Sequence, residues 1–116
     1  MPLKVMYLDD EPDLCDIFSD EFSTDEIIIV TFTDANNAIE ASKRSPPDVI
    51  FVDYRLPGTS GDLVALEMPA AIPKYLMTGE VTVATKYKFN CVFGKPYDRE
   101  GIREILISLL AWQRAK

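Results

Sequence analysis

LKVMYLDD, residues 3–10, is a short apolar run that ends in two adjacent aspartates. Three further apolar runs also end in a polar residue: VIFV before Asp53, KYLM before Thr78 and CVFG before Lys95. Short runs that are apolar on both faces are typical of strands in a covered parallel sheet. The carboxyl ends of such strands line one crevice, where ligands bind. The sequence therefore predicts that Asp9, Asp10, Asp53, Thr78 and Lys95 share one site.

The rest of the chain alternates between strand patterns and helix patterns. We expect strands over residues 3–9, 27–32, 49–53, 74–78 and 91–95. Three groups of residues recur at helical spacing and predict helices: one after the first strand, one after the second strand and one at the end of the chain. The groups are Leu14, Ile17, Phe18 and Phe22; Ala35, Ala38, Ile39 and Ser42; and Ile102, Ile105, Leu106 and Leu109. The last group is expected to form a buried stripe. Alternation of this kind predicts right-handed crossovers and a doubly wound α/β sheet.

Two of the crossovers are short. Residues 61–68 leave room for about two helical turns before Pro69 and Pro73, so the third helix is predicted to be short. The connection between the fourth and fifth strands, residues 79–90, is close to the minimum for a full crossover. Its apolar residues Val81, Val83, Tyr87 and Phe89 follow a period of two. A fourth helix is therefore predicted to be short or irregular.

Size and composition restrict the classes of function. Residues 1–116 are predicted to form a single domain, and the net charge of −7 disfavours direct binding to nucleic acid. No apolar run is long enough to span a membrane, so we expect a cytoplasmic protein without membrane contact. Cys15 and Cys91 have no histidine beside them to complete a metal site, and both are expected to be small buried hydrophobes.

The motifs LDDEPD, VDYRLPGTSG, LMTGE and FGKP, in this order, resemble the receiver domain of two-component response regulators. The resemblance spans the whole chain. It implies a flavodoxin-like (βα)5 fold with strand order 2-1-3-4-5. It also implies that a histidine kinase or histidine phosphotransfer protein transfers a phosphoryl group to Asp53. Such a domain catalyses only its own phosphorylation and dephosphorylation, so it is not an enzyme in the usual sense.

The chemistry of this transfer explains the residue types. A carboxylate that attacks phosphorus approaches three anionic oxygens, and neighbouring carboxylates add to the repulsion unless a cation offsets it. Mg²⁺ prefers oxygen ligands and keeps several waters. Asp10, Asp53 and the backbone carbonyl of Arg55 are expected to hold it, with Asp9 orienting a bound water. Lys95 would bring positive charge to the phosphoryl group.

Thr78 is expected to complete the site, and Arg55 and Glu80 are expected to border its entrance. Thr78 would donate a hydrogen bond to the new phosphate. Arg55 and Glu80 carry opposite charges at loop positions that influence the lifetime of the acyl phosphate in the resembled family, and a salt bridge between them is expected to hinder the attacking water.

The chain departs from the family pattern where signals are read out. Val92 stands where receivers commonly carry an aromatic residue or histidine three positions before the lysine. Ile107 and Leu110 lie together on the last helix, beside the predicted core stripe, and are expected to contact an output partner.

Two alternative functions follow from the same residues. One is a receiver-like protein-binding module that is never phosphorylated, which the altered readout position favours. The other is a haloacid-dehalogenase-type phosphohydrolase. That enzyme needs an Asp-x-Asp motif after the first strand, and this chain has adjacent aspartates instead.

Overall fold

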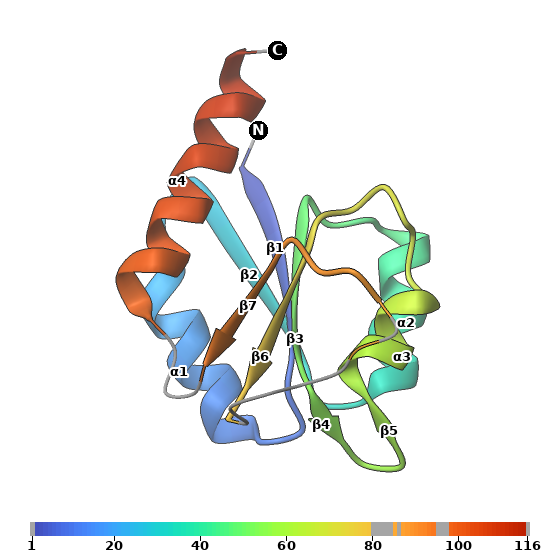
Figure 1. Ribbon diagram of the computed structural model, residues 1–116. Helices are drawn as coiled ribbons and strands as arrows, with labels where there is room; N and C mark the ends of the chain where they lie inside the picture. Colours follow the sequence, from blue (N-terminus) through green and yellow to red (C-terminus); the bar gives the residue numbers. More distant parts are fainter. Residues whose placement is uncertain (1, 80–84, 86, 95–97, 116) are drawn as a thin grey trace.

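A parallel sheet of five strands forms the centre of the molecule (Figure 1). The computed structural model describes residues 2–79, 85, 87–94 and 98–115. The strands of this sheet are β1 (Leu3–Leu8), β2 (Ile27–Phe32), β3 (Val49–Asp53), β6 (Lys74–Thr78) and β7 (Cys91–Gly94). Their spatial order is β2-β1-β3-β6-β7, which is 2-1-3-4-5 when only these strands are counted. The predicted flavodoxin-like topology is confirmed.

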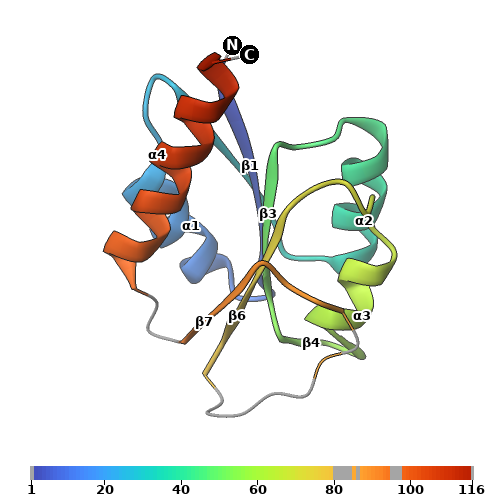
Figure 2. The same ribbon diagram turned by 45° about the horizontal axis from the view of Figure 1, so that its top comes forward.

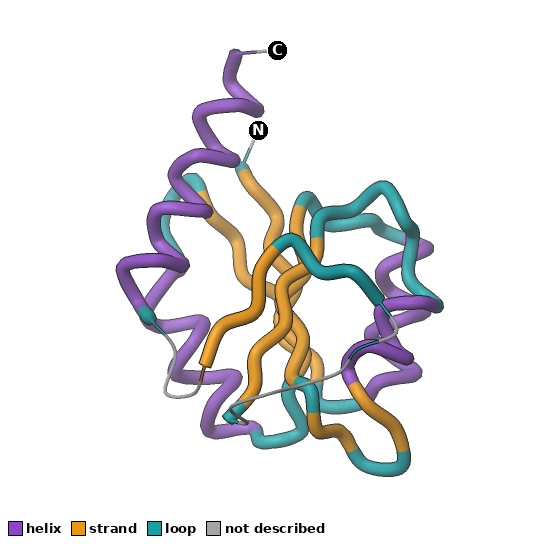
Figure 3. Tube along the Cα trace, viewed as in Figure 1, coloured by secondary structure: helices purple, strands orange, loops and turns teal. Residues whose placement is uncertain are grey.

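Helices cover both faces of the sheet (Figures 1 and 2). Helices α1 (Pro12–Phe22) and α4 (Arg99–Ala115) lie on one face, and α2 (Ala35–Arg44) and α3 (Gly61–Leu66) lie on the other. Helix α3 has only six residues, as the two prolines after it predicted. A small antiparallel ribbon of β4 (Arg55–Leu56) and β5 (Thr59–Ser60) projects from the sheet between β3 and α3 (Figure 3). None of the helices in the described part of the chain has the length and hydropathy of a membrane span.

The fourth crossover lies partly outside the described residues, which omit residues 80–84 and 86. Of this connection, Thr85 and residues 87–90 are described, and they form no helix. Instead, Phe89 packs against the core cluster on the α2 and α3 face, where a helix would otherwise lie.

Lys74, at the start of β6, is fully buried under this connection. Its ammonium group donates to the backbone oxygens of Pro69 (2.6 Å) and Ile72 (3.0 Å) and to the hydroxyl of Tyr87 (3.1 Å). Three acceptors satisfy the three N–H groups of the lysine, which makes its burial tolerable. Lys74 therefore links Tyr87, in the described part of this connection, to the start of β6.

Aromatic stacking dominates the core on the α1 and α4 face. The ring of Phe18, from α1, stacks on Tyr7 at 4.1 Å between centroids and lies 5.3 Å from Phe51. Phe18 and Phe22 lie on the buried face of α1, whereas Ile17 is 47% exposed. The predicted helix is therefore confirmed, and Ile17 lies outside the arc that faces the sheet.

The last helix buries Ile102 and Leu106 of the predicted stripe and partly buries Ile105 and Leu109, and it also buries Leu110. Ile102, Leu106 and Leu110 are buried, because their spacing of four residues keeps them on one side of α4. The prediction that Leu110 belongs to an exposed contact surface is therefore wrong. Leu110 is part of the same core cluster as Leu3. Ile107 is 56% exposed, as expected.

Exposure of the edge strand β7 corrects a second prediction. Cys91 is exposed rather than buried, because β7 is the last strand of the sheet and only β6 pairs with it among the described strands. Val92 is 51% exposed on this strand, while the adjacent Phe93 packs against the core on the α4 face. The residue at the family's usual readout position thus points away from the core that Phe93 joins.

Candidate functional site

Three carboxylates meet where β1 and β3 end. Asp9 and Asp10 follow β1 directly, and Asp53 is the last residue of β3. The two strands are parallel neighbours, with Leu8 opposite Val52, so their ends lie side by side. One oxygen from each of the three carboxylates lies within 4.8 Å of the others. The structure therefore brings together the three acids that the sequence predicted.

Burial differs among these acids. Asp9 is fully buried and Asp53 is 6% exposed, whereas Asp10 is open to solvent. Two buried anions beside a third are costly unless hydrogen bonds or a cation offset their repulsion. The cluster therefore has the charge and the oxygen donors that a divalent cation needs.

Hydrogen bonds fix the orientation of Asp9. The hydroxyl of Tyr7 donates to Oδ2 and the backbone N–H of Glu11 donates to Oδ1, each at 3.0 Å. Tyr7 lies two residues before Asp9 and therefore on the same side of the strand. Sequence reasoning missed this partner, although the period of two in LKVMYLDD would have indicated it.

Cys15 packs beneath the same acid. Its Sγ donates to the backbone oxygen of Asp9 at 3.4 Å, so the thiol lies close to a buried carboxylate. Burial, together with the negative charge of Asp9, raises the pKa of Cys15 to about 11. The thiol therefore stays protonated at neutral pH, and it is a poor nucleophile there.

We expect iodoacetamide at about pH 8 to alkylate Cys91 and to leave Cys15 unmodified in the native protein, since the thiolate is the reactive form. Cys91 is exposed, whereas Cys15 is buried and has a raised pKa. Intact-mass measurement should show one added group, and protein unfolded in guanidinium should show two. Rapid addition of two groups to native protein would contradict this arrangement.

The loop after Asp53 is held by backbone hydrogen bonds. The N–H of Tyr54 donates to the oxygen of Met77 (2.8 Å), and the N–H of Gly61 donates to the oxygen of Tyr54 (2.7 Å). Between them, the β4–β5 ribbon turns at Gly58, which adopts a φ of 72° that favours glycine. These hydrogen bonds hold the loop that carries Arg55, the predicted third metal ligand, two residues after Asp53.

Gly61 allows α3 to approach Asp53 closely. A Cβ at this position would collide with the backbone oxygen of Asp53 and crowd the side chain of Leu76. The sequence showed only a glycine at a helix start, because a close approach of this kind is a tertiary contact. Gly61 therefore positions the strand end that carries Asp53.

We expect Gly61→Ala to destabilise the protein by about 1–3 kcal/mol, because the added methyl meets backbone that cannot rotate away. Urea denaturation would measure this loss. Gly94→Ala is the matched control, since nothing lies within 4 Å of a Cβ added there. Equal losses of stability in the two variants would mean that the contact with Asp53 carries no cost.

Thr78 and Lys95 were predicted from the other two strand ends. Thr78 is the last residue of β6, is buried, and lies one residue beyond Met77, which pairs with Asp53. It is therefore adjacent to the acidic cluster. Lys95 lies outside the described residues, and so does Glu80, the predicted partner of Arg55. Arg55 itself is exposed.

Comparison with known proteins agrees with this geometry. Residues 5–107 match the family of the response regulator receiver domain. A protein described as the probable transcriptional regulatory protein TcrX of Mycobacterium tuberculosis is 30% identical over 118 residues, which cover 97% of this chain and 50% of that protein. The chain thus spans about half the length of this curated relative.

Solved structures share the fold at lower identity. The signal receiver domain of an HD domain-containing protein from Pseudomonas fluorescens Pf-5 has a TM-score of 0.83 at 15% identity, with 98% of this chain and 90% of that chain covered. The receiver domain of the sensor histidine kinase PA1611 from Pseudomonas aeruginosa PAO1 has a TM-score of 0.82 at 17% identity, with 96% and 99% covered. The latter structure is described with a magnesium ion coordinated in its active site cleft.

Proposed function

This chain belongs to the response regulator receiver domain family, and we propose that it accepts a phosphoryl group on Asp53 from a histidine kinase or histidine phosphotransfer protein. The observation that carries the proposal is the meeting of Asp9, Asp10 and Asp53 at the ends of two adjacent strands. Asp53 is the member of this cluster whose loop leads directly into a fixed ribbon and α3.

The residues of the cluster fit Mg²⁺. Their donors are oxygens only, and one oxygen of each acid lies within 4.8 Å of the others. Asp10, Asp53 and the carbonyl of Arg55 would hold the ion, and Asp9, whose two oxygens already accept hydrogen bonds, would orient a bound water. The bound ion would offset the negative charge that gathers as carboxylate and phosphoryl oxygens approach.

In the proposed transfer, an oxygen of Asp53 attacks phosphorus, and the bond from phosphorus to the donor's imidazole nitrogen breaks. The product is an acyl phosphate on Asp53 and a free imidazole on the donor. The hydroxyl of Thr78 donates a hydrogen bond to a phosphate oxygen, and Lys95 supplies positive charge there, a role that rests on the sequence motif alone. The domain thereby catalyses its own phosphorylation, and water later removes the group.

In this proposal the domain acts in the cytoplasm. Its output passes through protein contacts, because the net charge of −7 disfavours direct binding to nucleic acid. Ile107 is an exposed aliphatic residue on α4 that is available for such a contact, whereas Leu110 is not. Val92, in place of an aromatic switch, favours the alternative of a binding module that is never phosphorylated.

Treatment with acetyl phosphate distinguishes these two functions. The chain is incubated with this small phosphodonor in the presence of Mg²⁺ or of a chelator, and intact mass is measured. A phosphoacceptor gains the mass of one phosphoryl group only with Mg²⁺. A binding module gains none under either condition, although it would still fold.

A further inference from the structure

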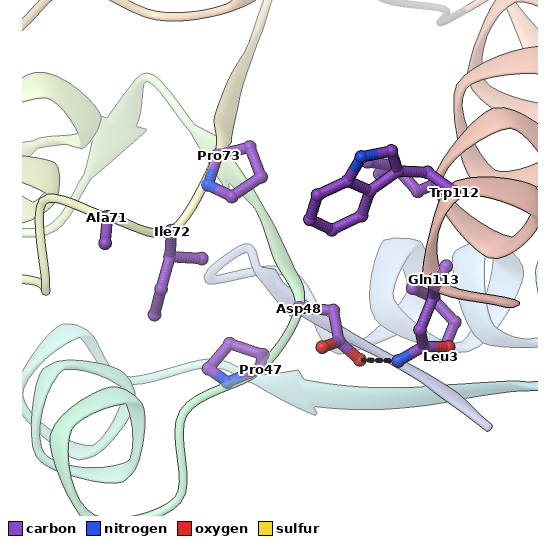
Figure 4. A pocket seen from close by; sticks show the side chains of 9 residues that line it. Leu3, Pro47, Asp48, Ala71, Ile72, Pro73, Trp112 and Gln113 are labelled. Atoms are coloured by element: carbon purple, nitrogen blue, oxygen red, sulfur yellow. Dashed lines mark hydrogen bonds between the residues drawn. The ribbon is translucent and has the colours of Figure 1, made fainter. Parts of the chain in front are cut away.

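A cavity of about 580 Å³ lies at the amino ends of the central strands, whereas the acidic cluster lies at their carboxyl ends. Its walls come from the segments at the beginnings of β1, β3 and β6 and from the last turns of α4 (Figure 4). The acids of the cluster stand at the other ends of β1 and β3. Its volume falls within the range of about 300–1,000 Å³ that is typical of small-molecule sites. The lining residues that matter below are Leu3, Asp48, Pro73, Leu109, Trp112 and Gln113.

The walls of this cavity are mainly apolar. Leu3, Pro73 and Leu109 supply aliphatic surface, and the indole ring of Trp112 extends over the opening toward Pro73 (Figure 4). Trp112 is 61% exposed, although tryptophan is the side chain with the most to gain from burial. An apolar body could therefore bind between the proline and the indole.

Asp48 is the charged side chain in the lining of the cavity. Oδ2 of Asp48 accepts from the backbone N–H of Lys4 at 2.8 Å and from Nε2 of Gln113 at 3.4 Å. Nearby cations are engaged elsewhere: the ammonium group of Lys4 donates to Ser45, and Arg114 pairs with Glu26. Within residues 2–79, 85, 87–94 and 98–115, no lysine or arginine side chain neutralises Asp48.

Gln113 adds an unsatisfied acceptor. Its Oε1 is buried and has no hydrogen-bond partner among the described residues, which is costly for an amide oxygen. Only the long contact of 3.4 Å holds Nε2 against Asp48. A half turn of the amide would exchange the two atoms and place Oε1 beside the carboxylate, where both oxygens could accept from one donor.

We propose that this cavity binds a small organic cation, with an ammonium or guanidinium group carried on an apolar body. The cationic group would lie between Asp48 and the turned amide of Gln113, and the body would pack against Pro73 and the indole of Trp112. A cation near an indole face gains further stabilisation. This site is separate from the proposed phosphoryl chemistry and does not depend on it.

Titration with three related probes tests the proposal on the full chain. Phenethylammonium, 2-phenylethanol and 3-phenylpropionate share a ring and differ in charge. Trp112 is the only tryptophan, so its fluorescence reports on this cavity. We expect phenethylammonium to bind about tenfold more tightly than the alcohol, and the carboxylate to bind most weakly. Equal affinities for the three probes, or no binding of the ammonium, would overturn the proposal.

Variants locate the interaction. Asp48→Asn keeps an oxygen for the N–H of Lys4 but removes the charge, so the preference for the ammonium over the alcohol should disappear. Asp20→Asn makes the same change of net charge on an exposed residue of α1 and should keep the preference. Gln113→Leu should weaken binding of the ammonium severalfold more than binding of the alcohol, and it decides the question if Asp48→Asn does not fold. An unchanged preference in either cavity variant would overturn the assignment.

Discussion

Asp53→Asn should reduce labelling by acetyl phosphate to background while the protein remains folded. The amide has nearly the shape of the carboxylate, but it is a poor nucleophile and cannot form the acyl phosphate. Asp53 is also almost fully buried beside Asp9 and Asp10, so removing one of three clustered negative charges should not lower stability. Intact mass after incubation with Mg²⁺ and acetyl phosphate measures the label, and urea denaturation measures stability.

Asp62→Asn is the matched control for this loss. Asp62 is a buried carboxylate on α3, nine residues after Asp53, that accepts a hydrogen bond from Ser60 and lies outside the acidic cluster. Its amide variant should be labelled like the wild type. If Asp53→Asn is labelled as well as the wild type, another carboxylate is the acceptor and the assignment is wrong.

Asp10→Ala should weaken Mg²⁺ binding by at least about tenfold, because the variant loses one of two proposed carboxylate ligands together with its charge. Asp10 is the exposed member of the cluster, so its truncation should have little effect on folding. Isothermal titration with MgCl₂ measures the affinity directly.

Asp13→Ala serves as the comparison for Asp10→Ala. Asp13 is an exposed acid in the first turn of α1, three residues further on, and it is not part of the cluster. The Asp13→Ala variant should retain the wild-type affinity for Mg²⁺. Similar weakening in both variants would show that only the general negative potential matters and that Asp10 is no ligand.

The strand ends could be predicted from the sequence, because buried parallel strands are short apolar runs and the first polar residue after each run marks its end. Asp9 and Asp53 follow such runs, and the fold then places neighbouring strand ends together. No knowledge of side-chain packing was needed for this step. The short α3 was likewise predictable, because prolines limit its length.

The errors concern burial, which depends on what covers a residue. Cys91 reads as a core residue, but β7 is an edge strand, and edge position is a property of the whole sheet. Leu110 was assigned to the wrong side of α4, because a helical wheel does not show which arc faces the sheet when apolar residues occupy a wide sector.

Contacts between distant segments also escaped prediction. The collision that any side chain at Gly61 would make with Asp53, and the hydrogen bond from the buried Lys74 to Tyr87, both depend on segments that the sequence does not show to be neighbours. A glycine or a lysine has many ordinary explanations in a sequence. Only the folded arrangement identifies the one that applies.

The most direct test of the central claim is to map the phosphoryl group itself. The chain is phosphorylated by a phosphorylated histidine phosphotransfer protein or by acetyl phosphate with Mg²⁺. Borohydride then reduces the acyl phosphate to the side-chain alcohol, which releases the phosphate and leaves homoserine at the acceptor position, and the chain is digested for peptide mass spectrometry. We expect the modification on the peptide that contains Asp53 and on no other. Modification of Asp9 or Asp10, or none with either donor under conditions in which a control receiver is labelled, would contradict the proposed function.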